Sequence, residues 1–344
     1  MLDEIELQRD YLKEKKINSV YFGGGTPSVL NPDELHAILD KICSIFNLSA
    51  TAEISLEANP DDLSPEYVRD LNDLGINRLS IGVQSFFDDD LMWMNRRHNR
   101  DQSVNSVEIS KKAGFKNISI DLIYGIPGMK EDKWKENLKI AFDNKINHLS
   151  AYNLTLENKT VYSHKVSKGL MKEPDEKASL KQYEILMDTA ERERFMHYEI
   201  SNFCLPGQFS VHNTSYWLQK HYLGIGPSAN SFNGRSRHWN IRNNSLYIEK
   251  IEDGIIPCES EDLDIGKKYN EYVLTSLRTM WGADLEVIKN KFGKELSEHF
   301  SRELRIFLDQ GMVKQSGSRV RLGRSGKFIA DGIISRLFWT GNIV

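Results

Sequence analysis

The stretch SVYFGGGTPSVL, residues 19–30, decides the fold of this chain. Its first four residues are β-rich and stop at three glycines, which is typical of a strand that ends in a turn. Apolar residues then recur with helical spacing over residues 32–46, with Asn31 as a plausible N-cap, Pro32 at the first helical position and Glu34 where a capping box places its acid. The stretch therefore predicts a strand, a glycine turn and a helix.

The same alternation continues to about residue 200. Strands are predicted over residues 53–58, 78–83, 117–124, 148–154 and 197–200, with helices over 65–74, from 101 to 114, 133–144 and 179–195. Six strands separated by helices predict an α/β fold with a parallel sheet, a partial (βα)6 barrel. The chain opens with a predicted helix over residues 1–15, where a barrel of this kind would open with a strand. We therefore expect a first strand to be missing.

The pattern changes after residue 263. Helices are predicted over residues 266–279, 285–292 and 294–310, followed by a hairpin that ends at residue 322 and a helix over 325–338. This order resembles a winged helix, and its balance of acid and base favours packing over DNA binding. The predicted domains are a partial barrel at 1–205, a connecting segment at 206–263 and a winged-helix-like domain at 264–344.

The composition of the chain argues against several classes of function. The chain has 344 residues and a net charge of -4, which leaves no basic footprint for nucleic acid. It contains no run of 18 apolar residues and no signal-peptide pattern, so neither a membrane span nor export is expected. Cys43, Cys204 and Cys258 are few, odd in number and far apart, which is typical of a protein of the reducing cytoplasm.

Polar residues gather just after the predicted strands. Backbone groups of a glycine run can approach a ligand closely, and acid, amide and arginine side chains around it suit a small zwitterion that carries a sugar. Each residue alone also fits a tight turn, a cap or a surface ion pair. Their shared place at the carboxyl ends of parallel strands favours a binding site. The residues are Gly24, Gly25, Thr26, Glu57, Gln84, Arg96, Asp121 and Tyr152.

A family resemblance rests on five motifs in this order and spacing. They are YFGGGTPSVL, ISLEANPDDL, RLSIGVQSFFDDDLMWMNRRHN, ISIDLIYGIPG and HLSAYNLTLE, which begin at residues 21, 54, 78, 118 and 148. Together they resemble the radical-SAM proteins of the oxygen-independent coproporphyrinogen III oxidase family, over nearly the whole chain. The resemblance implies a radical-SAM barrel and S-adenosylmethionine (SAM) as ligand.

The resemblance also implies how SAM is held. Gly24, Gly25 and Thr26 would contact its methionine part, and Glu57 and Arg96 would flank the methionine charges. Arg96 is the better partner for the carboxylate, because a guanidinium matches it bidentately. Gln84 and Asp121 would hold the ribose, and Ala151 or Tyr152 would line the adenine.

One departure from this family concerns the iron–sulfur cluster. The family binds a [4Fe–4S] cluster through Cys-x3-Cys-x2-Cys after the first barrel strand, and this chain has no such triplet. With the missing strand, this predicts that the chain is truncated at its N-terminus. As written it is expected not to cleave SAM reductively and to bind SAM weakly.

A second set of residues is the sequence HNTSYW, residues 212–217. Histidine is a good axial ligand for heme iron, Tyr216 lies four residues further on the same helical face, and Trp217 adds a flat apolar surface. The alternative is that these residues form a polar loop with two aromatic side chains that only pack against the protein. Within the resemblance, His-Asn-x-x-Tyr-Trp is the hallmark of HemW-type heme chaperones, which makes His212 the expected iron ligand and Tyr216 and Trp217 the expected porphyrin contacts.

Three functions stay open at this point. The leading one is a heme chaperone with heme and heme-accepting apoproteins as partners, no nucleic acid, peripheral membrane association through the acceptor, and a homodimer as a further expectation. The second is an oxygen-independent coproporphyrinogen III oxidase, if the full-length protein supplies the cluster segment. The third is a non-functional remnant, in which an exposed sheet edge would cause aggregation.

Overall fold

The computed structural model describes residues 1–158 and 160–341, and these form two compact units. The first unit combines residues Met1–Ser19, Asp33–Ala52 and Ser210–Val344, and the second combines Val20–Pro32 with Glu53–Phe209. The domain boundaries expected from the sequence, at residues 205 and 263, stay predictions.

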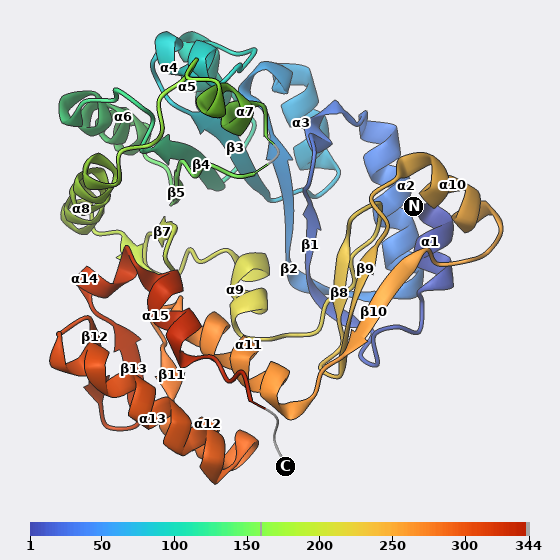
Figure 1. Ribbon diagram of the computed structural model, residues 1–344. Helices are drawn as coiled ribbons and strands as arrows, with labels where there is room; N and C mark the ends of the chain where they lie inside the picture. Colours follow the sequence, from blue (N-terminus) through green and yellow to red (C-terminus); the bar gives the residue numbers. More distant parts are fainter. Residues whose placement is uncertain (159, 342–344) are drawn as a thin grey trace. The chain divides into compact units, whose positions relative to one another are not determined.

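The second unit holds most of a curved sheet with the strand order β1-β2-β3-β4-β5-β7-β6, in which the first residues of β1 and β2 belong to the first unit (Figure 1). Strands β2 to β5 pair in parallel, each with the next along the chain, whereas β7 pairs antiparallel with both β5 and β6. The predicted α/β fold is confirmed. The strands are β1 (Lys16–Phe22), β2 (Asn47–Ala58), β3 (Arg78–Gln84), β4 (Asn117–Tyr124), β5 (His148–Asn153), β6 (Met196–His197) and β7 (Asn202–Cys204).

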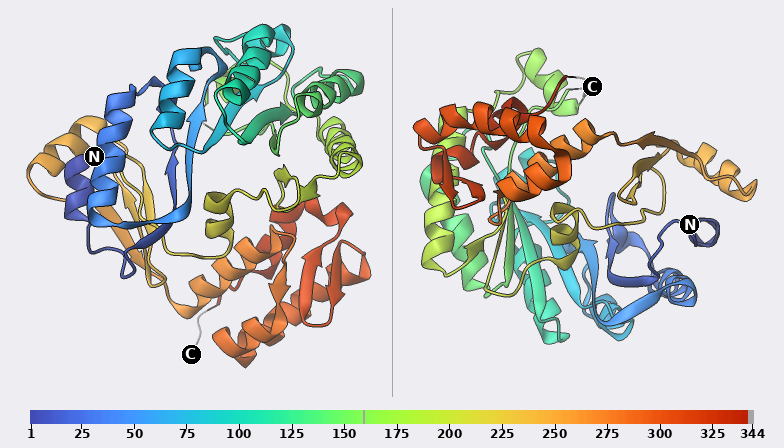
Figure 2. Two further views of the ribbon diagram at one scale, coloured as in Figure 1. Left: turned by 180° about the vertical axis from the view of Figure 1, so that it is seen from behind. Right: turned by 90° about the horizontal axis from the view of Figure 1, so that it is seen from below.

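Helices cover one face of this sheet, as two views of the ribbon show (Figures 1 and 2). The strand residues on that face are apolar and buried, among them Leu56, Ile81 and Ile120, which are all 0% exposed. Successive strand residues point to opposite faces, so the other face carries the polar members of the same strands. The helices are η1 (Pro27–Val29), η2 (Pro60–Asp62), α3 (Pro65–Asp73), α4 (Asp88–Trp93), α5 (Arg100–Lys112), α6 (Glu131–Asp143), α7 (Val161–Ser167) and α8 (Glu176–Arg192).

The prediction of a sixth parallel strand at residues 197–200 is wrong. The chain instead turns back after His197, and β6 and β7 form a short antiparallel hairpin. The carboxylate of Glu199 stabilises this turn, because its Oε1 accepts the backbone N–H of Ser201 at 3.0 Å. The predicted helix at residues 1–15 is also too long: α1 spans only Leu2–Leu7, and β1 already begins at Lys16.

The first unit joins an N-terminal layer to the C-terminal domain. An antiparallel sheet of order β10-β9-β8 lies beside α1, and the C-terminal helices surround a second sheet of order β11-β13-β12 (Figure 1). The predicted last helix is divided into two. The elements are α2 (Pro32–Ile45), α9 (Val211–Trp217), β8 (Asn230–Phe232), β9 (Ser236–Asn240), α10 (Asn244–Glu252), β10 (Cys258–Asp262), α11 (Ile265–Leu277), β11 (Ala283–Asp284), α12 (Leu285–Phe292), α13 (Lys294–Asp309), β12 (Val313–Ser316), β13 (Arg319–Leu322), α14 (Arg324–Lys327) and α15 (Ala330–Leu337).

A buried carboxylate connects α1 to this N-terminal layer. Glu4 is 0% exposed, and its oxygens accept hydrogen bonds from the backbone N–H of Gly226 at 2.7 Å and from Asn240 Nδ2 at 2.6 Å. Gln8 Nε2 donates to it at 2.9 Å, and the hydroxyl of Tyr247 on α10 donates to its second oxygen. One side chain of α1 therefore holds a loop, a strand and a helix together.

Among the residues that the structure describes, no helix has the length and apolar character needed to cross a membrane.

Candidate functional site

The glycine run after β1 is held by Glu57, which lies near the end of β2. The Glu57 carboxylate accepts a hydrogen bond from Tyr21 Oη at 2.7 Å and from the backbone N–H of Gly24 at 3.1 Å. Gly24 and Gly25 have φ angles of 75° and 88°, which strongly favour glycine. All three glycines are exposed, and Thr26 follows as the N-cap of η1. The turn thus presents backbone groups to a ligand beside a fixed carboxylate.

Arg96 is placed by an irregularity in β3. The register of β3 against β4 shifts between Ile81 and Gln84, and Gln84 takes a left-handed φ of 66°. The Arg96 Nη2 donates to Asn59 Oδ1 at 2.9 Å and to the carbonyl of Gly82 at 3.2 Å. A Cβ at Gly82 would come within 2.9 Å of Gln84 Nε2 and 3.2 Å of Arg96 Nη2. A side chain at position 82 would therefore displace the ends of the Gln84 and Arg96 side chains.

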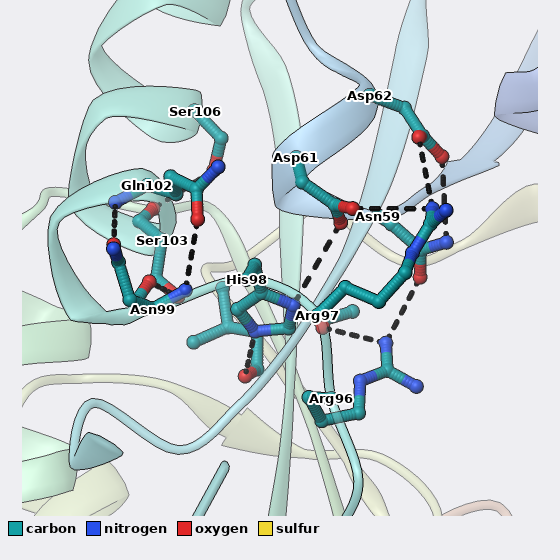
Figure 3. Close-up of polar contacts among 12 residues, drawn as sticks. Asn59, Asp61, Asp62, Arg96, Arg97, His98, Asn99, Gln102, Ser103 and Ser106 are labelled. Atoms are coloured by element: carbon teal, nitrogen blue, oxygen red, sulfur yellow. Dashed lines mark hydrogen bonds and ion pairs between the residues drawn. The ribbon is translucent and has the colours of Figure 1, made fainter. Parts of the chain in front are cut away.

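The residues that follow Arg96 fix its loop (Figure 3). Arg97 Nη2 pairs with Asp61 at 3.1 Å and with Asp62 at 3.3 Å. The buried ring of His98 contacts the carbonyl of Val83 through Nε2 at 3.0 Å. Burial lowers the pKa of His98 and that of Arg96. Arg97 and His98 thus act on the site through the position of Arg96.

Asp121 lies on the polar face of β4, between two neighbouring strands. It accepts a hydrogen bond from Ser80 Oγ on β3 at 3.3 Å and lies opposite Ser150 on β5. Burial and, to a smaller extent, the charge of Glu57 raise the pKa of Asp121 to about 6, against the opposing effects of the hydrogen bonds from Ser150 and Ser80 and of the charge of Arg78. Glu57 and Asp121 therefore bring two carboxyl groups to one face of the sheet.

The raised pKa of Asp121 predicts a pH dependence of folding. Because its folded-state pKa of about 6 exceeds the ordinary value of 3.8, the folded chain binds more protons than the unfolded chain between these values. The Asp121 contribution to the free energy of unfolding should therefore fall as the pH rises from about 4 to about 6.

We expect Asp121→Asn to remove that fall and to stabilise the chain at pH 7. Urea midpoints measured from pH 4 to pH 8 check this, with Asp132→Asn as the matched control because the Asp132 side chain is 96% exposed. A steeper loss of stability in Asp121→Asn than in the unsubstituted chain would contradict the assignment.

Ala151 differs from the other predicted SAM residues. Its Cβ lies on the apolar face of β5, it is 1% exposed, and its backbone N–H donates to the carbonyl of Ser201 at 2.8 Å. Tyr152, the next residue, lies on the polar face and is 44% exposed. The side chain near a bound adenine would therefore come from Tyr152, and Ala151 could contribute only backbone.

Several polar residues of the sheet were missed by sequence reasoning. Ser119 Oγ lies 2.7 Å from His148 Nδ1, and His148 Nε2 lies 2.8 Å from Tyr198 Oη. These three side chains are buried, and burial lowers the pKa of His148 well below its ordinary value. Alternation was the available signal, because a serine or histidine at every second position of a strand must share a face.

The second predicted set, His212, Tyr216 and Trp217, lies on α9 in the first unit. Ser210 caps this helix by accepting the backbone N–H of Asn213 at 3.2 Å. The rings of His212 and Tyr216 meet edge to face at 4.8 Å, and Ser19 Oγ lies 3.2 Å from His212 Nδ1. The structure therefore brings His212 and Tyr216 together on one face of α9.

Around α9 the surface is aromatic and partly exposed. Tyr216 is 38% exposed, and its ring meets that of Tyr222 edge to face at 4.5 Å. Burial raises the pKa of Tyr216 to about 12, so its hydroxyl stays protonated at neutral pH. Val211 and Leu218, at the two ends of the helix, are 40% and 50% exposed. Such a surface suits a flat apolar ligand.

The cysteines do not form a cluster site. Cys43 is exposed, Cys204 is buried and Cys258 is half-buried, and they occur on different elements. Within residues 1–158 and 160–341, no group of three His, Cys, Asp or Glu side chains could hold a metal ion. The residues present in this chain therefore do not fit a [4Fe–4S] cluster.

Comparison with known proteins places the chain among radical-SAM relatives. The model of the radical SAM superfamily matches residues 2–141, and that of the HemN C-terminal domain matches residues 267–329. The heme chaperone HemW of Lactococcus lactis is 33% identical over 326 residues, which is 94% of this chain and 85% of that protein. HemW of Bacillus subtilis is 33% identical over 92% of this chain and 84% of its own length.

A solved structure supports the same architecture. Coproporphyrinogen III oxidase (HemN) of Escherichia coli matches with a TM-score of 0.83, over 98% of this chain and 81% of that one. The two sequences are 19% identical, so the likeness concerns the fold alone.

Proposed function

Because this chain belongs to the family of the heme chaperone HemW, we propose that it binds heme and transfers it to an acceptor protein such as a respiratory cytochrome. The observation that carries the proposal is the arrangement on α9. There a histidine and a tyrosine share one face of a short helix, their rings 4.8 Å apart. The peripheral membrane association and the homodimer expected from the sequence stay predictions.

His212 is the proposed iron ligand. The imidazole can bind iron through one nitrogen when the other is held by a hydrogen-bonding partner that fixes the ring. Ser19 Oγ lies 3.2 Å from Nδ1 of His212 and would fix the ring in this way. A partly exposed site suits a carrier, because cargo that must be handed on has to leave.

Tyr216 and Trp217 are the proposed porphyrin contacts. Aromatic rings stack on flat apolar ligands with little loss of conformational entropy, and Tyr216 is braced edge to face by Tyr222. Half-exposed Val211 and Leu218 add apolar area at either end of the helix. Binding heme would cover this area and so gain hydrophobic free energy.

SAM is the proposed ligand of the polar face of the sheet. When bound, SAM supplies an activated sulfonium group. The glycine turn fits it, because Gly24, Gly25 and Thr26 offer exposed or half-exposed backbone groups to its methionine part. Arg96 would pair with the methionine carboxylate and Glu57 with the ammonium group. Gln84 and Asp121 would hold the ribose hydroxyls, and the backbone of Ala151 with the ring of Tyr152 would line the adenine.

A heme titration tests the proposed function. The chain should give a saturable shift of the Soret band, and the loaded chain should then pass heme to an apo-cytochrome faster than free heme reaches it at the same concentration. A shift that keeps rising without saturation, or transfer no faster than from free heme, would contradict the chaperone function.

A further inference from the structure

Arg278, the residue that ends α11, lies over the ring of Trp217 at the end of α9. Its Cζ is 5.7 Å from the centre of that ring. Its Nη1 donates to Asp331 Oδ1 on α15, and the Asp331 side chain is 81% exposed whereas that of Arg278 is 21% exposed. The positively charged guanidinium of Arg278, from the C-terminal domain, thus lies against the tryptophan of the predicted heme motif.

Two hydrogen-bond donors at this contact lack an acceptor. Trp217 Nε1 and Arg278 Nε are both buried, and neither donates to any atom of the described residues. A buried donor without an acceptor costs free energy, so such groups normally have partners. The Nε side of a guanidinium is also one of the edges that bind a carboxylate bidentately. A planar, anionic acceptor from outside the chain would satisfy these donors once the side chains that cover them shift.

We propose that Arg278 and the indole N–H of Trp217 bind a propionate carboxylate of heme. The inference rests on the proposed function and deepens it, because it names the group of the cargo that is recognised. Trp217 lies five residues after His212, which is a rise of about 7.5 Å along a helix. That separation is of the order of the reach of a porphyrin from its iron to its edge, where the propionates are attached.

The position of Arg278 would also give heme an orientation. One edge of the porphyrin carries both propionates and the opposite edge is apolar. With iron bound to His212, the charged edge would point toward the Trp217 end of α9 and the apolar edge toward Val211, which is 40% exposed. Arg278 is thus a specificity residue for a carboxylated porphyrin.

The test combines a protein change with a ligand change. Unsubstituted chain, Arg278→Gln and Arg336→Gln are each titrated with heme and with heme dimethyl ester, whose propionates are blocked. Arg336→Gln is the control, because Arg336 lies on the same helix as Asp331 and also makes an ion pair, with Glu303 at 2.9 Å, but its side chain is 68% exposed. Loss of a charge-assisted hydrogen bond predicts about a tenfold weaker affinity of Arg278→Gln for heme. Its affinity for the ester should equal that of the unsubstituted chain.

The outcomes separate this inference from the proposed function. Equal affinity of Arg278→Gln and the unsubstituted chain for heme, or an equal loss for heme and ester, overturns the carboxylate assignment while heme binding stands. If the titration of the unsubstituted chain with heme does not saturate, the proposed function is wrong, and this inference is wrong with it. If Arg278→Gln does not fold, Trp217→Phe gives the same test, since it keeps an aromatic ring, removes the N–H and should weaken binding of heme more than binding of the ester.

Discussion

Replacing His212 with alanine is expected to weaken heme binding by about 100-fold while the chain stays folded. Loss of even an outer partner of a metal ligand typically costs 10–100-fold in metal affinity, and His212 is the proposed ligand itself. The side chain is half-buried on a short helix, so its removal leaves no large cavity in the core. Heme titrations followed at the Soret band measure the affinity, and far-UV circular dichroism checks the fold.

His221→Ala is the control for this change. His221 lies four residues beyond Trp217 and is exposed, with a ring contact to Phe232 at 6.0 Å. The His221→Ala variant should bind heme with the same affinity as the unsubstituted chain. Equal losses in the two variants would show that the surface attracts heme without a specific iron ligand, and an unchanged affinity in His212→Ala would refute the assignment of the ligand.

The second large effect concerns Glu4. Glu4→Ala should destabilise the first unit by about 3 kcal/mol or more, because it leaves several buried donors without an acceptor. The backbone N–H of Gly226 and the amide of Asn240 lose their bonds of 2.7 and 2.6 Å, and the hydroxyl of Tyr247 loses its acceptor as well. Burial and the neighbouring Glu4 raise the pKa of Tyr247, so this hydroxyl stays a donor at neutral pH.

Glu6→Gln is the matched control on the same helix. Glu6 pairs with Lys41 at 2.6 Å and with Arg9 at 2.6 Å, but its side chain is 42% exposed. Surface ion pairs of this kind contribute little to stability, so the urea midpoint should barely move. The measurement is urea unfolding followed by tryptophan fluorescence. Similar midpoints for Glu4→Ala and Glu6→Gln would mean that the contacts of Glu4 do not stabilise the fold.

Much of the fold could be predicted because its signals are local. The strand at residues 117–124 is β4 as predicted, and the predicted helix at 32–46 is α2 with one residue less. The hairpin of β6 and β7 could not be predicted in this way. Its turn depends on Glu199, whose carboxylate bonds to a neighbouring backbone N–H and so competes with a continuous strand.

The candidate sites show the same limit. Glu57 and Gly24 could be placed at the same edge of the sheet in advance, because Glu57 lies near the carboxyl end of one predicted strand and Gly24 follows another. The left-handed backbone of Gln84 could not be predicted from the sequence, since a register shift inside β3 produces it. The contact of Trp217 with Arg278 joins residues on two helices that are far apart in the sequence. Pattern reasoning finds residues that share a strand end or a helix face, and misses those that only tertiary packing joins.

The hairpin also changes how the sheet can associate with other chains. At one edge the sheet ends in β6, which is two residues long, and so offers few unpaired backbone groups for strand addition. At the other edge of the described sheet lies β1, with seven residues. Strand addition at the β6 edge of the described sheet is therefore disfavoured, because two residues leave too few backbone groups to pair with another chain.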